Sequence, residues 1–410
     1  MILNSLKKSL LGVFLLSAFV FISSSIMLSD ISLDGYDESF YGKYAAILHN
    51  QGIAGIRDLI SAFPKEREDE APPTPLRILF VAVGAASCSV LSTCGIENLA
   101  LISFLSGIAV VLVSFLFFRK MFTPAIAFLS ASLLAFSPLL LAQSGRALQD
   151  TFFTLIIIAS MFFYHLLWTR KMAADSLIFG LLLLAGFLTK ETMVFFYPCF
   201  VVVGLYYYRQ KAHHTSLLKI ISPLIITPIL YFFIASTIAG GFREFFDYYL
   251  LWSKRVEQVL YVIQFQHGPW FRYLVDFTLV SPLTFLLGII GTVIAIPDTK
   301  NASGRNIATL YLLSGLAVFS AFSVYNLRMM LFLEVFIRAL AVIAVIELLN
   351  RIKNNQSRRI AAVFVCIFII GAEISQFHRL FVVANVYDPV TVLLIQSDGF
   401  VNENLKFQLK

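Results

Sequence analysis

Long apolar runs recur along this chain and are separated by short segments that hold most of its lysines and arginines. A helix needs about 20 apolar residues to cross the hydrocarbon core of a membrane, and several of these runs reach that length. Apolar side chains form 59% of the 410 residues and charged ones only 13%, proportions that an ordinary soluble domain does not have. The sequence therefore predicts an all-α, multi-pass integral membrane protein.

The apolar runs predict about eleven transmembrane helices. They lie near 9–29, 99–118, 122–141, 151–168, 176–189, 192–208, 217–236, 274–296, 307–325, 329–349 and 360–376. The run 76–92 is a twelfth candidate. The basic clusters between the runs all fall on the cytoplasmic side only if 76–92 does not cross, and the positive-inside rule favours that arrangement. We therefore expect 76–92 to form an interfacial helix.

This topology divides the chain into a transmembrane domain over 1–376 and a short extracytoplasmic tail over 377–410. It places the N-terminus in the cytoplasm. We expect the protein to lie in the plasma membrane. Residues 30–98 then form the first extracytoplasmic loop, and 237–273 form a later one. Both loops are long enough to cover a cavity at the outer face.

Charge and cysteine content narrow the function classes. The net charge of +7 comes from basic clusters between apolar runs, as in cytoplasmic membrane loops, so it does not indicate a nucleic-acid partner. Cys88 and Cys94 share the first predicted outer loop, where a disulfide and two free thiols both remain open. The expected partners are membrane lipids and a substrate at the outer face.

The stretch LDGYDESFYGKYA, residues 33–45, places three carboxylates where the first span is expected to emerge. Charges at this level of a membrane are costly unless they are solvated, paired or face a cavity, so Asp34, Asp37 and Glu38 are functional candidates. Asp34 and Asp37 have a second interpretation as caps of the following helix, because an aspartate there binds free backbone N–H groups. Capping explains one or two acids, but three of them beside Tyr41 favour a function.

Three other predicted outer turns carry charged side chains. Arg146 and Asp150 lie four residues apart, either as a salt bridge or with Asp150 presented to the same cavity as Asp37. Lys190 is either a phosphate ligand or a lysine that extends to the membrane interface. Arg328 is either a partner for a lipid phosphate or a positional anchor. Acids and cations thus converge on the outer surface, which suits chemistry on a lipid-borne phosphate.

Five sequence elements over residues 9–208 follow one another in the order found in a known family of membrane enzymes. They are Asp37-Glu38-Ser39-Phe40-Tyr41 after the first span, Pro72-Pro73-Thr74-Pro75-Leu76, Arg119-Lys120 at the end of a span, Ser137-Pro138 leading to Arg146 and Asp150, and Leu188-Thr189-Lys190. Together they resemble the C-type glycosyltransferases (GT-C) that use polyprenyl-phosphate sugars, particularly the protein mannosyltransferase and aminoarabinose transferase branch. The resemblance implies a GT-C fold with juxtamembrane helices in the first extracytoplasmic loop.

The resemblance also implies a reaction, in which a sugar passes with inversion from a polyprenyl-phosphate carrier to a protein, lipid or glycan acceptor. Asp37 is then the base that takes a proton from the acceptor at the extracytoplasmic face. The residues expected to bind the lipid phosphate are Arg146, Lys190, Arg328 and Tyr41. Glu38 and Asp150 are expected to orient the acceptor or to hold a divalent ion such as Mg²⁺, Mn²⁺ or Zn²⁺.

The sequence departs from the family pattern at two places. Ala71 stands where a histidine or lysine often precedes the proline pair, and IENLALIS has no arginine at the start of the second span, so the acceptor and carrier contacts need not match those of the family. Asp34-Gly35-Tyr36 also resembles the Asp-Gly-Tyr of oligosaccharyltransferase catalytic subunits, which makes Asp34 an alternative base. A transporter and a non-catalytic assembly subunit remain as alternative functions, and the sequence names neither sugar nor acceptor.

Overall fold

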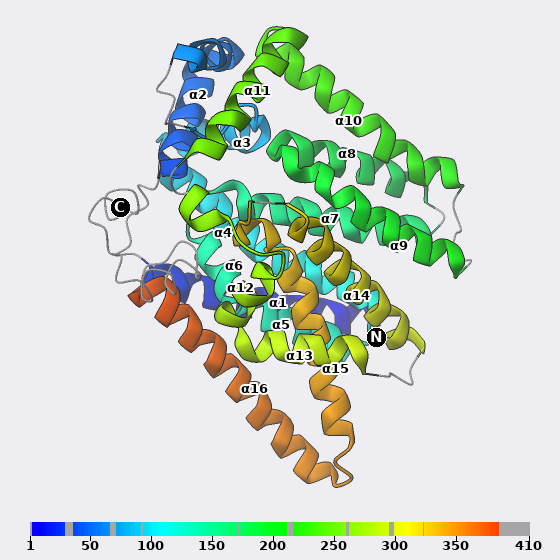
Figure 1. The fold of residues 1–410 in the computed structure, drawn as a ribbon. Helices are drawn as coiled ribbons and strands as arrows, with labels where there is room; N and C mark the ends of the chain where they lie inside the picture. The colour runs from blue at the N-terminus through cyan, green and yellow to red at the C-terminus, as the bar shows by residue number, and fades with distance from the viewer. Residues whose placement is uncertain are drawn as a thin grey trace. The chain divides into compact units, whose positions relative to one another are not determined.

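The structure is a computed structural model that describes residues 2–28, 36–65, 71–91, 93–170, 172–210, 216–259, 262–294, 299–322 and 324–384. Over these residues it is built of helices and has no β-strand (Figure 1), so the predicted all-α fold is confirmed. The α-helices are α1 (Ile2–Met27), α2 (Tyr36–Ala62), α3 (Ile78–Leu91), α4 (Ile96–Met121), α5 (Pro124–Ala135), α6 (Pro138–Ser144), α7 (Gln149–Thr169), α8 (Ala173–Thr189), α9 (Tyr197–Arg209), α10 (Leu217–Ala239), α11 (Phe242–Gln258), α12 (Arg272–Val280), α13 (Pro282–Val293), α14 (Thr299–Ser320), α15 (Leu333–Asn350) and α16 (Asn355–Phe377). Short 3₁₀ or π segments are η1 (Phe63–Lys65), η2 (Glu191–Phe196), η3 (Val262–Gln266), η4 (Leu327–Met330) and η5 (His378–Val383).

Six helices in the described part of the chain are long and apolar enough to cross a membrane. They cover Lys8–Met27, Ile96–Met121, Gln149–Thr169, Glu191–Arg209, Leu217–Ala239 and Asn355–Val383. A seventh is possible if α5 and α6, which are bent by 56° at their junction, form one broken span. By this criterion the predicted number of about eleven spans is not confirmed.

Prolines explain why several apolar runs give shorter helices than expected. The predicted span 122–141 divides at Ser137-Pro138, where Pro138 is the first residue of α6 and the Ser137 hydroxyl caps it by accepting from Leu140 N. The predicted span 274–296 divides in the same way at Ser281-Pro282, between α12 and α13. A proline lacks a backbone N–H and fits the first turn of a helix, so it begins a new helix within an apolar run.

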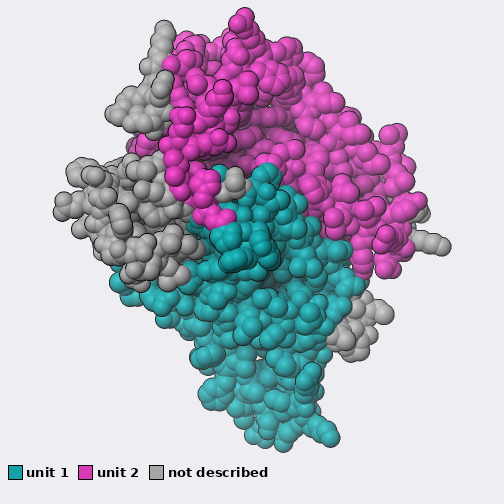
Figure 2. All heavy atoms as spheres, viewed as in Figure 1, with its two compact units in different colours: residues 1–31, 106–145, 269–401 teal, residues 32–105, 146–268, 402–410 magenta. Residues whose placement is uncertain are grey.

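The chain forms two compact units, each assembled from segments that are distant in sequence. Unit 1 comprises 1–31, 106–145 and 269–401, and unit 2 comprises 32–105, 146–268 and 402–410 (Figure 2). The sequence-based site candidates Asp37, Glu38, Tyr41, Arg146, Asp150 and Lys190 all belong to unit 2, and Arg328 belongs to unit 1. Asp34 and the residues 385–410 of the predicted tail lie outside the described residues.

Unit 1 is organised around α15, whose residues 333–344 are all buried. Helices α5, α13 and α14 pack against it. A Cβ atom at Gly291 would collide with the carbonyl oxygen of Leu340, so the close approach of α13 to α15 requires a glycine there. The core of this unit is therefore formed by one helix from the first third of the chain and three from the last third.

Three ionisable side chains form a network in the interior of unit 1. Arg338 on α15 pairs with Glu334 one turn earlier and, at 2.8 Å, with Glu373 on α16. None of the three side chains is more than 1% exposed. Hydroxyl groups complete the network, because Ser137 donates to Glu334 at 2.6 Å and Ser281 donates to Glu373 at 3.0 Å. The network joins α15 to α16 and to the starts of α6 and α13.

Unit 2 contains α7, α8, α9 and α10, which lie side by side, with α8 between α7 and α10 (Figure 1). Helix α2 packs on α3 and on α10, and it bends at Gly52, whose φ of 63° is one that residues with a side chain rarely adopt. The predicted outer loop 237–273 contains a helix, α11, which follows α10 after Gly240 and Gly241. Gly240 ends α10 with a left-handed φ of 102°.

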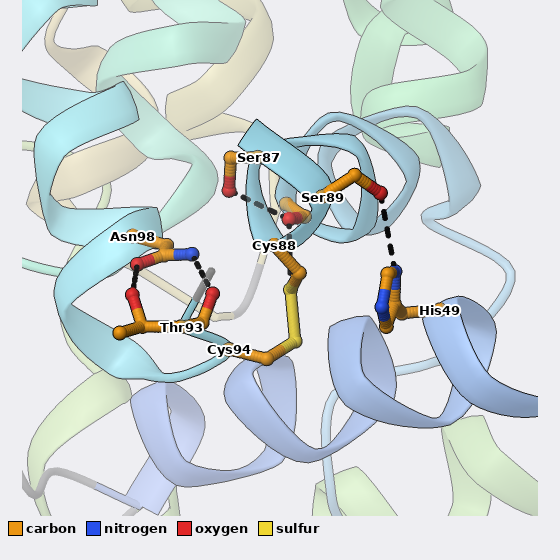
Figure 3. The surroundings of a disulfide bond; sticks show 8 residues. His49, Ser87, Cys88, Ser89, Thr93, Cys94 and Asn98 are labelled. Atoms are coloured by element: carbon orange, nitrogen blue, oxygen red, sulfur yellow. Dashed lines mark hydrogen bonds between the residues drawn. A yellow bond between two sulfur atoms is a disulfide. The ribbon is translucent and has the colours of Figure 1, made fainter. Parts of the chain in front are cut away.

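The run 76–92 folds as α3, a helix of 14 residues, which is shorter than the about 20 that a transmembrane helix needs. A disulfide between Cys88 and Cys94 connects its end to the segment before α4, with Cα atoms 4.6 Å apart (Figure 3). Of the two alternatives that the sequence leaves open, the structure has the disulfide. Asn98 Nδ2 donates to the carbonyl oxygen of Thr93 at 2.7 Å and holds this turn from the α4 side.

Candidate active site

The first turn of α2 carries the two described acids of the LDGYDESFYGKYA stretch. The helix begins at Tyr36, so Asp37 and Glu38 lie where backbone N–H groups have no helical partner and where a negative charge is favourable. Their exposure differs, since Asp37 is half-buried whereas Glu38 is 2% exposed. Tyr41 follows one turn after Asp37 and is 1% exposed. This turn therefore places one partly accessible carboxylate beside a buried acid and a buried tyrosine.

Arg146 pairs with Glu38. Its Nη1 atom lies 3.5 Å from Glu38 Oε1, and the arginine side chain is 21% exposed. The sequence offered an i, i+4 pair between Arg146 and Asp150, but Arg146 lies between the end of α6 and the start of α7, so the spacing is not helical. The ion pairs that the structure does form join each of these residues to a different partner.

Asp150, in the first turn of α7, pairs with Lys190. The Lys190 Nζ atom lies 2.8 Å from Asp150 Oδ1, and the two side chains are 6% and 4% exposed. Lys190, the last residue of the Leu188-Thr189-Lys190 element, lies in the extended turn between α8 and η2. Its ammonium group also lies 6.0 Å from the centre of the Phe153 ring. The burial of Lys190 differs from that of a lysine which extends into the membrane interface.

Arg77 lies at the centre of a contact network that sequence reasoning missed. Its Nε and Nη2 atoms bind the two carboxylate oxygens of Glu191 at 3.1 and 2.6 Å, a bidentate pair. Its Nη1 atom donates to the Tyr41 hydroxyl at 2.9 Å, and its guanidinium lies 5.6 Å from the ring centre of Trp252. Burial alone lowers the pKa of Arg77, but the charges of Glu191 and Tyr41 and the hydrogen bonds to both together outweigh it and hold that pKa well above its usual value. The signal in the sequence is an arginine between a proline cluster and an apolar run.

Gln149 connects these contacts. With its amide oxygen facing Tyr41 and Arg77, it accepts hydrogen bonds from both at 2.9 Å, and its nitrogen donates to the carbonyl oxygen of Thr189 at 2.7 Å. Gln149 directly precedes Asp150, and Thr189 directly precedes Lys190. The network therefore joins the second turn of α2 to the residue before α3, the start of α7 and the turn after α8.

Two of the acids act electrostatically on Tyr41. Burial raises the pKa of the Tyr41 hydroxyl, the Arg77 charge opposes that rise, and the charges of Asp37 and Asp150 add to it. Such effects decline with distance, so both carboxylates lie near the hydroxyl. Asp37 and Asp150, which are more than a hundred residues apart in sequence, thus both act on the Tyr41 hydroxyl.

A divalent ion does not fit the described residues well. They contain no group of three or more histidine, cysteine, aspartate or glutamate side chains placed to hold a metal. The two predicted ligands, Glu38 and Asp150, each face a cation, Arg146 and Lys190 respectively. A metal at either carboxylate would have to displace its paired cation.

Arg328 lies in unit 1, in the short helix η4, and is half-buried. Its backbone N–H and its Nε atom both donate to the side-chain oxygen of Asn326, at 3.1 and 3.2 Å. Asn326 in turn receives support from Tyr273, whose hydroxyl accepts from Asn326 N at 3.1 Å. The arginine is therefore held by local contacts within its own unit.

Comparisons with known proteins place the fold. Residues 78–238 match the family model described as dolichyl-phosphate-mannose-protein mannosyltransferase. That segment contains Arg77's neighbour Ile78 and continues through Asp150 and Lys190. No curated protein matches the sequence.

The chain resembles several solved structures. ArnT from Cupriavidus metallidurans bound to undecaprenyl phosphate has a TM-score of 0.56 at 15% identity, covering 86% of this chain and 62% of ArnT. The oligosaccharyltransferase of Archaeoglobus fulgidus in the apo form has a TM-score of 0.58 at 12% identity, covering 98% and 60%. AglB from the same organism, in complex with an inhibitory peptide and a dolichol-phosphate, has a TM-score of 0.57 at 15% identity, covering 91% and 56%.

The match thus spans about three fifths of the length of each of these structures. At such low identity the likeness concerns the fold. ArnT and the oligosaccharyltransferases are the two branches that the sequence elements of this chain resemble, at Asp37-Glu38 and at Asp34-Gly35-Tyr36 respectively. The chain therefore has the fold of the C-type glycosyltransferases, as its resemblance to them in sequence predicts.

Proposed function

We propose that this chain is a membrane glycosyltransferase that moves a sugar from a polyprenyl-phosphate carrier to an acceptor at the extracytoplasmic face, with inversion. One observation carries the proposal. Ion pairs between four separate segments of unit 2 join six charged side chains, and a seventh, Asp37, is the neighbour of one of them in sequence, in a chain with only 13% charged residues. They are Asp37, Glu38, Arg77, Arg146, Asp150, Lys190 and Glu191. Charged groups buried in a membrane protein are costly, so a cluster of them indicates a functional site.

Asp37 is the proposed base. Glu38 and Asp150 are buried in ion pairs with Arg146 and Lys190, whereas Asp37 is half-buried and so more accessible to an acceptor. The acceptor hydroxyl or amine attacks the anomeric carbon of the sugar and gives its proton to the Asp37 carboxylate. A bond forms between the acceptor and that carbon as the bond to the phosphate oxygen breaks. One displacement of this kind inverts the anomeric centre.

The leaving group is the lipid phosphate, which departs with the electron pair of the broken bond. Fixed cations stabilise the charge that develops on it. Of the two proposed phosphate ligands in the cluster, Arg146 is the more accessible, with 21% of its side chain exposed, and Lys190 lies deeper. Arg328 remains a third candidate in unit 1. The undecaprenyl phosphate bound to ArnT and the dolichol-phosphate bound to AglB support a carrier of this class.

The disulfide supports an extracytoplasmic site. Disulfides persist in oxidising compartments and are rare in the cytosol. The Cys88–Cys94 bond closes the end of α3, the helix that begins directly after Arg77. A site built on this helix is therefore expected outside the cytoplasm, as the basic clusters of the sequence also indicate.

The test is sugar transfer by purified protein in lipid nanodiscs. A panel of radiolabelled polyprenyl-phosphate sugars is offered with protein, lipid and glycan acceptors, and release of the lipid phosphate is followed together with movement of the label. Wild-type protein should consume one donor, and Asp37→Asn should be inactive although it folds. Asp58→Asn, on the exposed side of the same helix, is the matched control and should keep full activity.

Two results contradict the proposal. One is a folded wild-type protein that transfers no label from any donor. The other is an Asp37→Asn variant with the wild-type rate. Uptake of a labelled sugar by sealed vesicles, with no transfer, would instead favour the transporter alternative.

A further inference from the structure

Arg77 contacts two parts of the cluster that come from different segments of the chain. Its Nη1 atom donates to the hydroxyl of Tyr41, one helical turn after Asp37. Its Nε and Nη2 atoms hold both oxygens of Glu191, the residue directly after Lys190. The guanidinium group therefore joins the helix that carries the proposed base to the turn that carries a proposed phosphate ligand.

We propose that Arg77 is a positioning residue that fixes the distance between Asp37 and Lys190 by binding Tyr41 and Glu191 at once. This inference rests on the proposed function, since it assigns Asp37 to the acceptor and Lys190 to the lipid phosphate. Arg77 itself is assigned no contact with the acceptor or with the lipid phosphate. Its effect on the reaction passes through the two residues that it holds.

The hydrogen bonds of Tyr41 determine the direction in which its hydroxyl proton points. A tyrosine hydroxyl has one proton to donate and can accept from other donors. Since Arg77 donates to the oxygen, the proton of Tyr41 points away from Arg77 and toward the Gln149 amide oxygen, 2.9 Å distant. Both functions of the hydroxyl are then occupied within the protein. Tyr41, which the sequence suggested as a substrate ligand, is accordingly assigned to the support of Asp37.

Arginine has the geometry that this position needs. Its planar fork binds a carboxylate through two nitrogens while a third nitrogen remains for another acceptor, whereas a lysine offers a single ammonium group. The indole of Trp252 lies over the guanidinium at 5.6 Å, and its Nε1 atom donates to the carbonyl oxygen of Pro72 at 2.8 Å. Trp252 thus holds the guanidinium and the proline cluster before it.

The kinetic test compares Arg77→Lys with the wild-type protein in the transfer assay. The charge is kept but the fork is lost, so the proposed base and phosphate ligand become less well aligned. Misplacement of about 1 Å costs about a hundredfold in rate, so kcat should fall by about ten- to a hundredfold while the KM for the lipid donor stays nearly unchanged. Arg243→Lys is the matched control, because Arg243 is an exposed arginine of the same unit with 88% of its side chain accessible.

A second test needs no substrate. Tyr41→Phe and Glu191→Gln are made singly and together, and the apparent unfolding temperature of each purified protein is measured in one detergent. If Arg77 joins the two residues, their effects should be non-additive in the wild-type background and additive in an Arg77→Met background. Arg77→Gln replaces Arg77→Met in the cycle if the latter does not accumulate.

The outcomes are distinguishable. Non-additivity that disappears with Arg77, together with a loss of kcat in Arg77→Lys, supports the positioning role. Wild-type kcat in Arg77→Lys overturns it, and so does non-additivity that persists without Arg77. A raised donor KM with unchanged kcat overturns it as well, because Arg77 would then bind the donor directly. If the wild-type protein transfers no sugar, the proposed function fails, and the unfolding cycle still decides whether Arg77 couples the two turns.

Discussion

The Nζ atom of Lys190 lies 2.8 Å from Oδ1 of Asp150, and neither side chain is more than 6% exposed. An ion pair at this depth behaves differently from one at the surface. Removal of one partner leaves the other charge buried without compensation, which costs about 3–5 kcal/mol, whereas an exposed pair contributes about 1 kcal/mol or less. A test of Lys190 in donor binding therefore has to remove the charge of Asp150 as well.

The double variant Lys190→Met with Asp150→Asn should fold, because no unpaired charge remains in the interior. If Lys190 binds the lipid phosphate, the KM for the donor should rise by about one to two powers of ten, the loss expected for one charge-assisted hydrogen bond. Steady-state kinetics on monodisperse protein measure this. A double variant with normal donor kinetics would show that the pair serves the fold alone.

The disulfide should stabilise the end of α3. The Cys88–Cys94 bond joins two cysteines with a sequence separation of 6. In the chain-entropy model, closing a loop of that size stabilises the folded protein by about 2 kcal/mol. Cys88→Ser should lower the apparent unfolding temperature, and a reductant should lower that of the wild-type protein but not of the variant. Cys366→Ser is the control, since Cys366 is a free thiol. Maleimide labelling of Cys88 without prior reduction would contradict the bond.

Much of the fold follows from the sequence because burial in a membrane depends on simple runs of apolar residues. The runs at 99–118, 151–168 and 217–236 each correspond to one long helix. Sequence reasoning was less successful where a run contains an internal break. The junction at Ser137-Pro138 lies within an apolar stretch, and the mean hydropathy of that stretch does not reveal a break. A serine followed by a proline is nevertheless a usual start of a helix.

The site was only partly predictable, for a physical reason. Asp37, Glu38, Asp150, Arg146 and Lys190 stand out because a charge next to an apolar run is costly in a membrane. Their pairing was not predictable, because it depends on which helices meet in space. Asp150 pairs with Lys190 across forty residues of chain, not with Arg146 four residues away. Gln149 carries no charge, so nothing in the sequence distinguished it.

The choice between Asp34 and Asp37 as the base is also testable. Asp37 lies in the first turn of α2, and Asp34 lies outside the described residues. Asp37→Asn should lose about 10²–10⁴-fold in turnover, because an amide cannot take the proton. Asp34→Asn should stay active, and both should keep their folding, since asparagine caps a helix nearly as well as aspartate. The rates of sugar transfer by the two purified variants distinguish the two candidates. If Asp34→Asn is inactive and Asp37→Asn is active, the base is Asp34.

Membrane topology can be checked with single cysteines in a background that lacks Cys199 and Cys366. Ser61→Cys should react with an impermeant maleimide from outside the cell, and Ser357→Cys only after the membrane is opened. Both positions are exposed. Glu97→Cys tests α3 itself. If it reacts only from the cytoplasmic side, α3 crosses the membrane despite its 14 residues, and the extracytoplasmic placement of Asp150 is wrong.

The network of Arg338 with Glu334 and Glu373 gives a prediction for unit 1. Arg338→Met should remove the only cation among these three buried groups and leave two carboxylates facing each other in the interior. The expected cost is about 3–5 kcal/mol, which is a large part of the stability of an ordinary domain.

Glu373→Gln should be milder than Arg338→Met, because its amide oxygen can still accept from Ser281 and Arg338. Size-exclusion profiles of fluorescent-protein fusions report the folded fraction of each variant, with Arg243→Met as the exposed control. The folded fraction should be small for Arg338→Met, intermediate for Glu373→Gln and unchanged for Arg243→Met. Equal profiles for all three would mean that the two glutamates do not depend on Arg338 for their burial, and that helix packing around α15 holds unit 1 together without this network.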